Sequence, residues 1–213
     1  KKINIEGKVK KQSGGHGQFA DCWINLEPTP RDAGFIFEDC IVGGAIPRQF
    51  IPSVEKWVRD ALQHGVLGGF PVVDVKVSLV DGKFHAVDSS DFAFQTAGSI
   101  AFKEGMAIAE PTLLEPIMHM EISVPESMTG DVLKDLSGRR GRVQGMSSRG
   151  TVQTIKAEAP MSEVLEYGNV LNGITSGQGT YIMSIASYKE VPEQIATRLL
   201  EALKKKKEAA EEE

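Results

Sequence analysis

Residues 71–110 read PVVDVKVSLVDGKFHAVDSSDFAFQTAGSIAFKEGMAIAE. The first ten residues alternate apolar and polar side chains for part of their length, which is typical of a half-buried strand. Residues 90–110 are almost all apolar or small, so they predict a helix that is covered on most sides and is stopped by Pro111. Its polar positions recur every four residues, at Asp91, Gln95, Ser99 and Lys103. The segment 83–91 is therefore a strand-to-helix turn, and it presents His85 on the surface.

The residues before this turn predict one α/β unit. Strand-like runs cover residues 9–12, 19–26 and 35–42. Pro52 then opens a helix, and Gly65 is placed to end it. The apolar residues of this helix recur at helical spacing, at Val54, Trp57, Val58, Ala61 and Leu62. One face of the helix must therefore lie on a sheet.

The residues after Pro111 predict a second unit with the element order β-α-β-β-α-β. The expected strands are 114–124, 142–147, 152–159 and 180–186. The expected helices are 129–137 and one that begins at Ser162, whose hydroxyl can cap it. This order is that of the split βαβ, ferredoxin-like arrangement. Pro192 then opens a last helix, whose apolar stripe is formed by Ile195, Leu199 and Leu203.

The composition is that expected of an ordinary soluble protein. It has 213 residues, 41% of them hydrophobic, and a formal net charge of -5. The negative charge argues against a generally basic nucleic-acid binder, so any contact with RNA must be local. No apolar run is long enough to span a membrane, and no secretory signal opens the chain. Because it begins at Lys1 without a methionine, we expect a fragment or a processed chain.

The two cysteines, Cys22 and Cys40, lie in apolar, strand-like segments. We expect both to be buried free thiols in a reducing compartment, with a disulfide as the alternative. No further ligands cluster near them, so no metal site is expected. The chain also contains no Gly-x-x-x-x-Gly-Lys-Ser/Thr loop, so no nucleotide site of that type is expected.

His85, Asp88 and Ser89 can be drawn as a hydrolytic triad. All three fall in one short loop, which is a poor arrangement for a relay, and no oxyanion hole is evident. The alternative is helix capping, in which Asp88, Ser89 or Ser90 accepts backbone N–H groups at the start of the helix. A helix cap does not require an imidazole at position 85.

Two further segments carry groups suited to RNA. The glycine-rich run Ser13–Gln18 can approach a ligand closely, and its side chains offer donors and acceptors, although a loose hairpin is the simpler interpretation. Arg139, Arg140 and Arg142 follow the end of a helix. Arginine suits a helix C-terminus, and it equally suits contacts with phosphate.

Several motifs together resemble the C-terminal part of bacterial elongation factor G, its fourth and fifth domains. The matching stretches are residues 12–18, 43–47, 69–74, 85–90, 100–105, 114–118 and 130–141. The resemblance covers almost the whole chain. His16 and Phe19 stand where the family commonly has arginine and tyrosine, so the chain looks more like the divergent second copies of this factor.

The resemblance implies an α+β protein of two domains. Residues 1–112 would form a ribosomal-protein-S5-like domain, with the C-terminal helix 190–207 packing back on it. Residues 113–189 would form the ferredoxin-like domain. The implied function is ribosome binding during movement of transfer and messenger RNA, as a cytoplasmic monomer with no membrane partner. GTP and magnesium would be bound by N-terminal domains of the parent, and this part would bind no cofactor or metal and carry no catalytic residue.

The resemblance also implies a set of contact residues. The tips that enter the decoding region of the small subunit would be formed by Ser13, Gly14, Gly15, His16, Gly17, Gln18, Lys83, His85, Asp88 and Ser89. Arg139, Arg140 and Arg142 would face ribosomal RNA. Two alternatives are a ribosomal protection or rescue factor of the same architecture, and a hydrolase that uses His85 and Ser89.

Overall fold

The computed structural model describes residues 1–11 and 17–211, which divide into two compact units. The first unit is Lys1–Pro111 together with the chain from Arg198 onward, and the second is Thr112–Thr197. Each unit has a four-stranded sheet and its own hydrophobic core. The α+β class and the two-domain organisation of the sheets are therefore confirmed.

The first sheet is mixed. Its strands are β1 (Ile3–Lys11), β2 (Gln18–Pro28), β3 (Phe35–Asp39) and β4 (Val75–Lys83). The order across the sheet is β1-β2-β4-β3, in which β2 is antiparallel to both neighbours and β3 is parallel to β4. A parallel pair needs a crossover, and the chain between β3 and β4 provides it with the turn η1 (Arg48–Phe50) and helix α1 (Ile51–His64).

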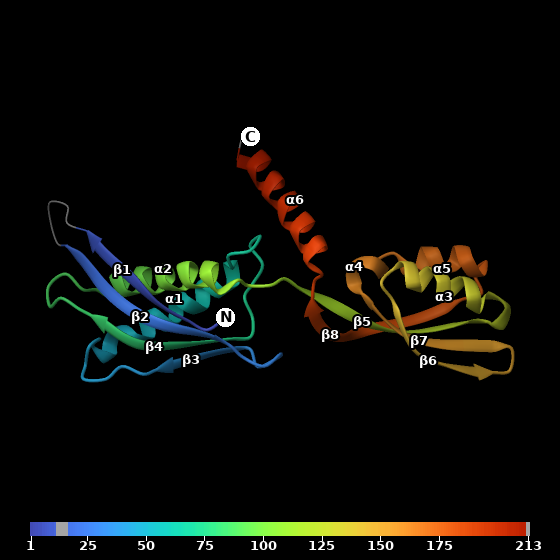
Figure 1. The fold of residues 1–213 in the computed structure, drawn as a ribbon, viewed down its shortest axis with the longest axis horizontal. Helices are drawn as coiled ribbons and strands as arrows, with labels where there is room; N and C mark the ends of the chain where they lie inside the picture. The colour runs from blue at the N-terminus through green and yellow to red at the C-terminus, as the bar shows by residue number, and fades with distance from the viewer. Residues whose placement is uncertain (12–16, 212–213) are drawn as a thin grey trace. The chain divides into compact units, whose positions relative to one another are not determined.

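Helices α1 and α2 (Asp91–Ala109) lie against one face of this sheet, as Figure 1 shows. The predicted apolar stripe of α1 is buried at Val54, Val58, Ala61 and Leu62, and Trp57 is half-buried. Gly65 ends the helix with φ of 50°, and its N–H donates to the carbonyl of Ala61. Both ends of the predicted helix are thus confirmed to within one residue.

Helix α2 is packed closely, as its composition predicts. Ala93, Ala97 and Ala101 are fully buried between the strands and α1. Small side chains there let the helix backbone approach its neighbours. The predicted polar stripe lies on the side away from the core, and it is exposed at Asp91 and at Lys103.

The second sheet has the predicted split βαβ topology. Its strands are β5 (Leu114–Pro125), β6 (Arg142–Arg149), β7 (Val152–Pro160) and β8 (Thr180–Glu190), in the order β6-β7-β5-β8 and all antiparallel. The connections carry η2 (Glu126–Met128), α3 (Thr129–Gly138), α4 (Met161–Val164) and α5 (Tyr167–Thr175). The core lies between one face of the sheet and these helices.

Three expectations from the sequence are wrong in detail. Ser162 does not cap a helix: the residue before the helix is Pro160, and the helix divides into α4 and α5. The strand expected at 71–80 begins only at Val75, because Asp74 has φ of 55° and its carboxylate accepts the N–H of Gly34. A left-handed residue interrupts a strand.

The third correction concerns the cysteines. Both are free, but only Cys22 is buried, and burial raises the pKa of its thiol to about 12. Strand β3 ends at Asp39 instead of residue 42, so Cys40 lies in the following loop and is exposed. The expectation of two buried thiols is therefore half correct.

The last helix, α6, runs from Glu193 to Glu211, directly after Pro192. Within the first unit, Leu200 and Leu203 lie within 3.3 Å of the position that a Cβ on Gly68 would occupy. Among the residues that the structure describes, no helix is both long and apolar enough to cross a membrane. The same residues contain no cluster of three or more side chains suited to a metal ion.

Candidate functional site

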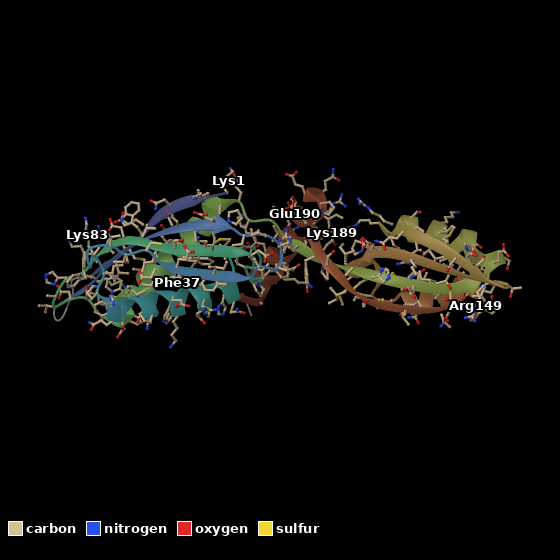
Figure 2. All side chains as sticks on the ribbon, turned by 90° about the horizontal axis from the view of Figure 1, so that it is seen from below. Lys1, Phe37, Lys83, Arg149, Lys189 and Glu190 are labelled. Atoms are coloured by element: carbon tan, nitrogen blue, oxygen red, sulfur yellow. The ribbon has the colours of Figure 1, made fainter. Side chains whose placement is uncertain are left out.

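The loop that carries His85 is short and lies at the end of the first sheet. Strand β4 ends at Lys83, which Figure 2 labels at that end, and α2 begins at Asp91. Ser90 caps the helix, since its side chain accepts the N–H of Ala93 at 3.2 Å. The His85 side chain is 57% exposed, so the imidazole is accessible to a partner.

Backbone and side-chain hydrogen bonds tie this loop to the start of β2. The hydroxyl of Ser89 donates to the carbonyl of Phe19 at 2.7 Å and accepts the N–H of His85 at 2.8 Å. The N–H of Phe19 donates to the carbonyl of Asp88, also at 2.8 Å. Phe19 directly follows the glycine-rich run, so the His85 loop and the end of that run lie side by side.

The glycine-rich run belongs in part to the described residues. Ser13, Gly14, Gly15 and His16 were predicted as tip residues and lie outside the described residues. Gly17 and Gln18 are described, and Gln18 is the first residue of β2. Gly17 lies against Asp88, because a Cβ on Gly17 would come within 2.9 Å of the Asp88 carboxyl carbon. The two predicted tips are therefore in contact at these residues.

The imidazole of His85 has three polar groups around its Nδ1 atom. The Asp88 carboxylate oxygen Oδ2 is 3.1 Å away. The N–H groups of Val87 and Asp88 point toward the same atom, at 3.4 and 3.3 Å. These contacts fix the ring in its loop. The hydrogen bonds found for the ring among the described residues are all to Nδ1.

The arrangement does not suit hydrolysis. A triad needs the serine hydroxyl to donate to the imidazole. Here the Ser89 hydroxyl donates to the Phe19 carbonyl, and the imidazole faces Asp88. Of the three capping candidates, only Ser90 caps α2, whereas Ser89 and Asp88 hold the loop to β2.

Exposed apolar side chains lie in the His85 loop and in the first turn of α2, and sequence reasoning did not single them out. They are Phe84, Val87 and Phe92, which are 46%, 66% and 56% exposed. Aromatic rings next to polar groups are suited to stacking on nucleobases. The signal was present in the sequence, since two phenylalanines stand beside a polar turn, but their exposure depends on how the turn meets the helix.

The second unit holds the three arginines that were predicted to contact RNA, and their surroundings differ. Arg139 donates to Asp135 at 2.8 Å and to the Glu163 carbonyl at 2.7 Å, and the hydrogen bond with Asp135 raises the pKa of Arg139. Arg140 is paired with Glu115 and lies 3.6 Å from Glu163. Arg142 is exposed at the start of β6. Only Arg142 is therefore presented outward without a carboxylate partner in the described chain.

Comparison with known proteins identifies the family. Residues 1–110 match the family model described as elongation factor G, domain IV, and residues 112–199 match the model described as elongation factor G C-terminus. The chain belongs to the elongation factor G family. The resemblance noted in the sequence is thereby confirmed, and the boundary between the two matches falls beside Pro111, where the structure also divides.

Two relatives show how much of the family's length is represented. The chain is 51% identical over 200 residues to elongation factor G of Aquifex pyrophilus, which covers 94% of this chain and 29% of that protein. A crystal structure from Thermus thermophilus matches with a TM-score of 0.86 and 44% identity, over 96% of this chain and 31% of that chain. The chain thus spans about a third of the length of the relatives that it matches.

Proposed function

We propose that this chain is the ribosome-contacting C-terminal part of a translational GTPase, and that it supports movement of transfer and messenger RNA. The observation that carries the proposal is an exposed loop with the His85 imidazole, held to the end of the glycine-rich run. Nearly all of this chain matches the elongation factor G family models. GTP and its magnesium ion would be bound by parts of the factor other than this chain.

The proposed work of the loop is to occupy space and to form hydrogen bonds, without making or breaking covalent bonds. The Ser89 hydroxyl holds the loop together and to β2, whereas the His85 side chain is exposed. The net charge of -5 gives no general attraction to RNA, so contacts must be made by local groups such as Lys83, His85 and the exposed rings of Phe84 and Phe92. In this proposal the loop enters the decoding region of a ribosome in the cytoplasm.

Single-round translocation measures this function directly. The chain would replace the matching segment of a full-length elongation factor G, and His85→Ala would be compared with His64→Ala. His64 is a matched control because it is also exposed, at the end of α1, and its one hydrogen bond within the described residues is with the Asp60 carbonyl. Gly14→Ala with Gly15→Ala tests the glycine-rich run in the same assay.

We expect His85→Ala to slow translocation about fivefold or more, since at least one hydrogen bond of about 1 kcal/mol is lost, and His64→Ala to leave the rate unchanged. Equal rates and equal ribosome affinity for all variants would overturn the proposal. Ribosome binding that depends on His85, combined with an unchanged translocation rate, would instead favour a protection or rescue factor.

A further inference from the structure

Asp88 contacts both the glycine-rich run, at Gly17, and the imidazole of His85. Its carboxyl group lies flat against Gly17, because a Cβ there would be 2.9 Å from Cγ, 3.0 Å from Oδ1 and 3.2 Å from Oδ2. Its Oδ2 is 3.1 Å from Nδ1 of His85, and its backbone carbonyl accepts the N–H of Phe19. The carboxylate is thus confined between the glycine-rich run and the imidazole, and it cannot turn away without disturbing one of them.

The position of this carboxylate decides where the imidazole carries its proton. A carboxylate only accepts hydrogen bonds, so a separation of 3.1 Å from Nδ1 is favourable only if Nδ1 bears the proton. The competing arrangement, in which Nδ1 accepts the N–H groups of Val87 and Asp88, has separations of 3.4 and 3.3 Å, beyond the usual range.

The arrangement in which Nδ1 donates to the Asp88 carboxylate is favoured, because its hydrogen bond is the stronger one. A hydrogen bond to an ionised acceptor is about twice as strong as a neutral one. Val87 is exposed and Asp88 is partly exposed, so water can satisfy their N–H groups if Nδ1 does not. The neutral ring therefore carries its proton on Nδ1, and its other nitrogen, Nε2, has a lone pair that can accept a hydrogen bond.

We propose that Asp88 is a positioning residue that holds His85 in the Nδ1–H tautomer, so that Nε2 is presented as a hydrogen-bond acceptor. An acceptor needs a donor, and RNA offers the ribose 2′-hydroxyl and the exocyclic amino groups of its bases. Phosphate oxygens only accept, so they do not suit the neutral ring. The choice of RNA as the ligand rests on the proposed function, whereas the tautomer follows from the geometry alone.

The tautomer can be measured by nitrogen-15 NMR of the ring nitrogens in the full 213-residue chain at about pH 8, where an ordinary histidine is neutral. His85→Gln identifies the His85 signals among those of the four histidines. We expect a protonated Nδ1 and an unprotonated Nε2 in the wild-type chain. Asp88→Ala removes the acceptor, and the Val87 N–H then favours an unprotonated Nδ1, so the ring should change to the Nε2–H form.

Two variants make the test specific. Asp91→Ala is the matched control, because its carboxylate accepts the Ser53 hydroxyl at 2.6 Å and makes no contact with His85, so the tautomer should not change. Asp88→Asn keeps the size and a neutral acceptor, and should give a mixture of the two tautomers. A wild-type ring in the Nε2–H form, or a tautomer that Asp88→Ala leaves unchanged, overturns the proposal.

The NMR measurement tests the positioning role independently of the proposed function, because it uses no ribosome. If the tautomer is as expected but His85→Ala translocates at the wild-type rate, the proposed function is wrong and the positioning role stands. If the ring is in the other form while His85→Ala is slow, the positioning role is wrong and the proposed function stands. With both intact, Asp88→Ala should slow translocation by up to about fivefold, the factor that corresponds to one hydrogen bond of about 1 kcal/mol.

Discussion

A Cβ atom on Gly7 would lie 2.1 Å from the carbonyl oxygen of Ala97. Gly7 is in the middle of β1 and Ala97 is on α2, so the helix lies directly on the strand at this point. The same Cβ would also lie 2.6 Å from the Cβ of Ala101. The absence of a side chain at position 7 is therefore what allows α2 to approach the sheet this closely.

Gly7→Ala should destabilise the first unit by about 2 kcal/mol or more, because the added methyl group forces the helix and strand apart. Urea unfolding followed by tryptophan fluorescence measures this unit selectively, since both tryptophans, Trp23 and Trp57, lie in it and all three tyrosines lie in the second unit. Lys103→Ala on α2 is the control, because Lys103 lies in the same unit and its side chain is exposed. An unchanged midpoint for Gly7→Ala would contradict the close packing.

Ser89→Ala should lower the free energy of unfolding of the first unit by about 1–2 kcal/mol. The change removes the acceptor of the His85 N–H and leaves the Phe19 carbonyl without its donor. Hydrogen exchange at the His85 amide should also become faster. Ser53→Ala, which removes an exposed hydroxyl that bonds Asp91, should stay within about 0.5 kcal/mol of the wild type. Equal exchange rates at His85 in both variants would show that Ser89 does not hold the loop.

Asp21→Asn should stabilise the first unit at neutral pH. Asp21 is 1% exposed, its Oδ1 lacks a hydrogen-bond partner in the described chain, and desolvation raises its pKa despite the attraction of Lys8 at 3.3 Å. A carboxyl group whose pKa is higher in the folded state binds more protons when folded. The contribution of Asp21 to the free energy of unfolding is therefore most favourable below the unfolded pKa, about 3.9. It is lost as the pH rises through the folded pKa.

The pH dependence provides the check for this prediction. At pH 7 the variant should be more stable than the wild type by on the order of 1 kcal/mol, since a buried charge is removed and the half-exposed Lys8 loses little. Toward pH 3 the difference should shrink, because Asp21 is then protonated in the wild type. Unfolding at several pH values, followed by tryptophan fluorescence, measures it. A variant that is less stable at pH 7 would show that the Lys8 ion pair outweighs the desolvation of Asp21.

Two arginines of the second unit, Arg139 and Arg142, should respond differently to substitution. Arg139→Ala should lower the stability of that unit by about 1–3 kcal/mol, because it leaves Asp135 without its partner and the Glu163 carbonyl without a donor. Arg142→Ala should leave stability unchanged, and, if it contacts RNA, should reduce the slope of log affinity for ribosomes against log salt by about 1. Hydrogen exchange in β5 reports the stability. If Arg142→Ala lost stability and Arg139→Ala did not, Arg142 and not Arg139 would be the residue that stabilises the unit.

Much of the local structure could be predicted because it depends on neighbours in the chain. The spacing of Val54, Val58 and Leu62 defines the buried face of α1, and Gly65 ends it, since glycine adopts the required positive φ without strain. Ser90 before Asp91 is a cap signal of the same local kind. The order of strands and helices after Pro111 likewise indicated the ferredoxin-like sheet.

Other features depended on partners that are distant in the sequence. The exposure of Cys40 depends on where β3 stops pairing with β4, and the pairing of Arg140 with Glu115 joins residues from β5 and the end of α3. The periodicity of a segment does not contain this information, because it records only which side of an element is apolar.

Motifs and periodicity along the chain were sufficient to indicate the family, the two-unit α+β organisation and an imidazole in a strand-to-helix turn. The folded chain was needed to show that Ser89 fastens this turn to β2 and that Asp88 fills the space beside Gly17. These contacts join residues about 70 positions apart. They form only when the register between β1, β2 and β4 has brought both loops to the same end of the sheet, and that register is set by packing of the whole core.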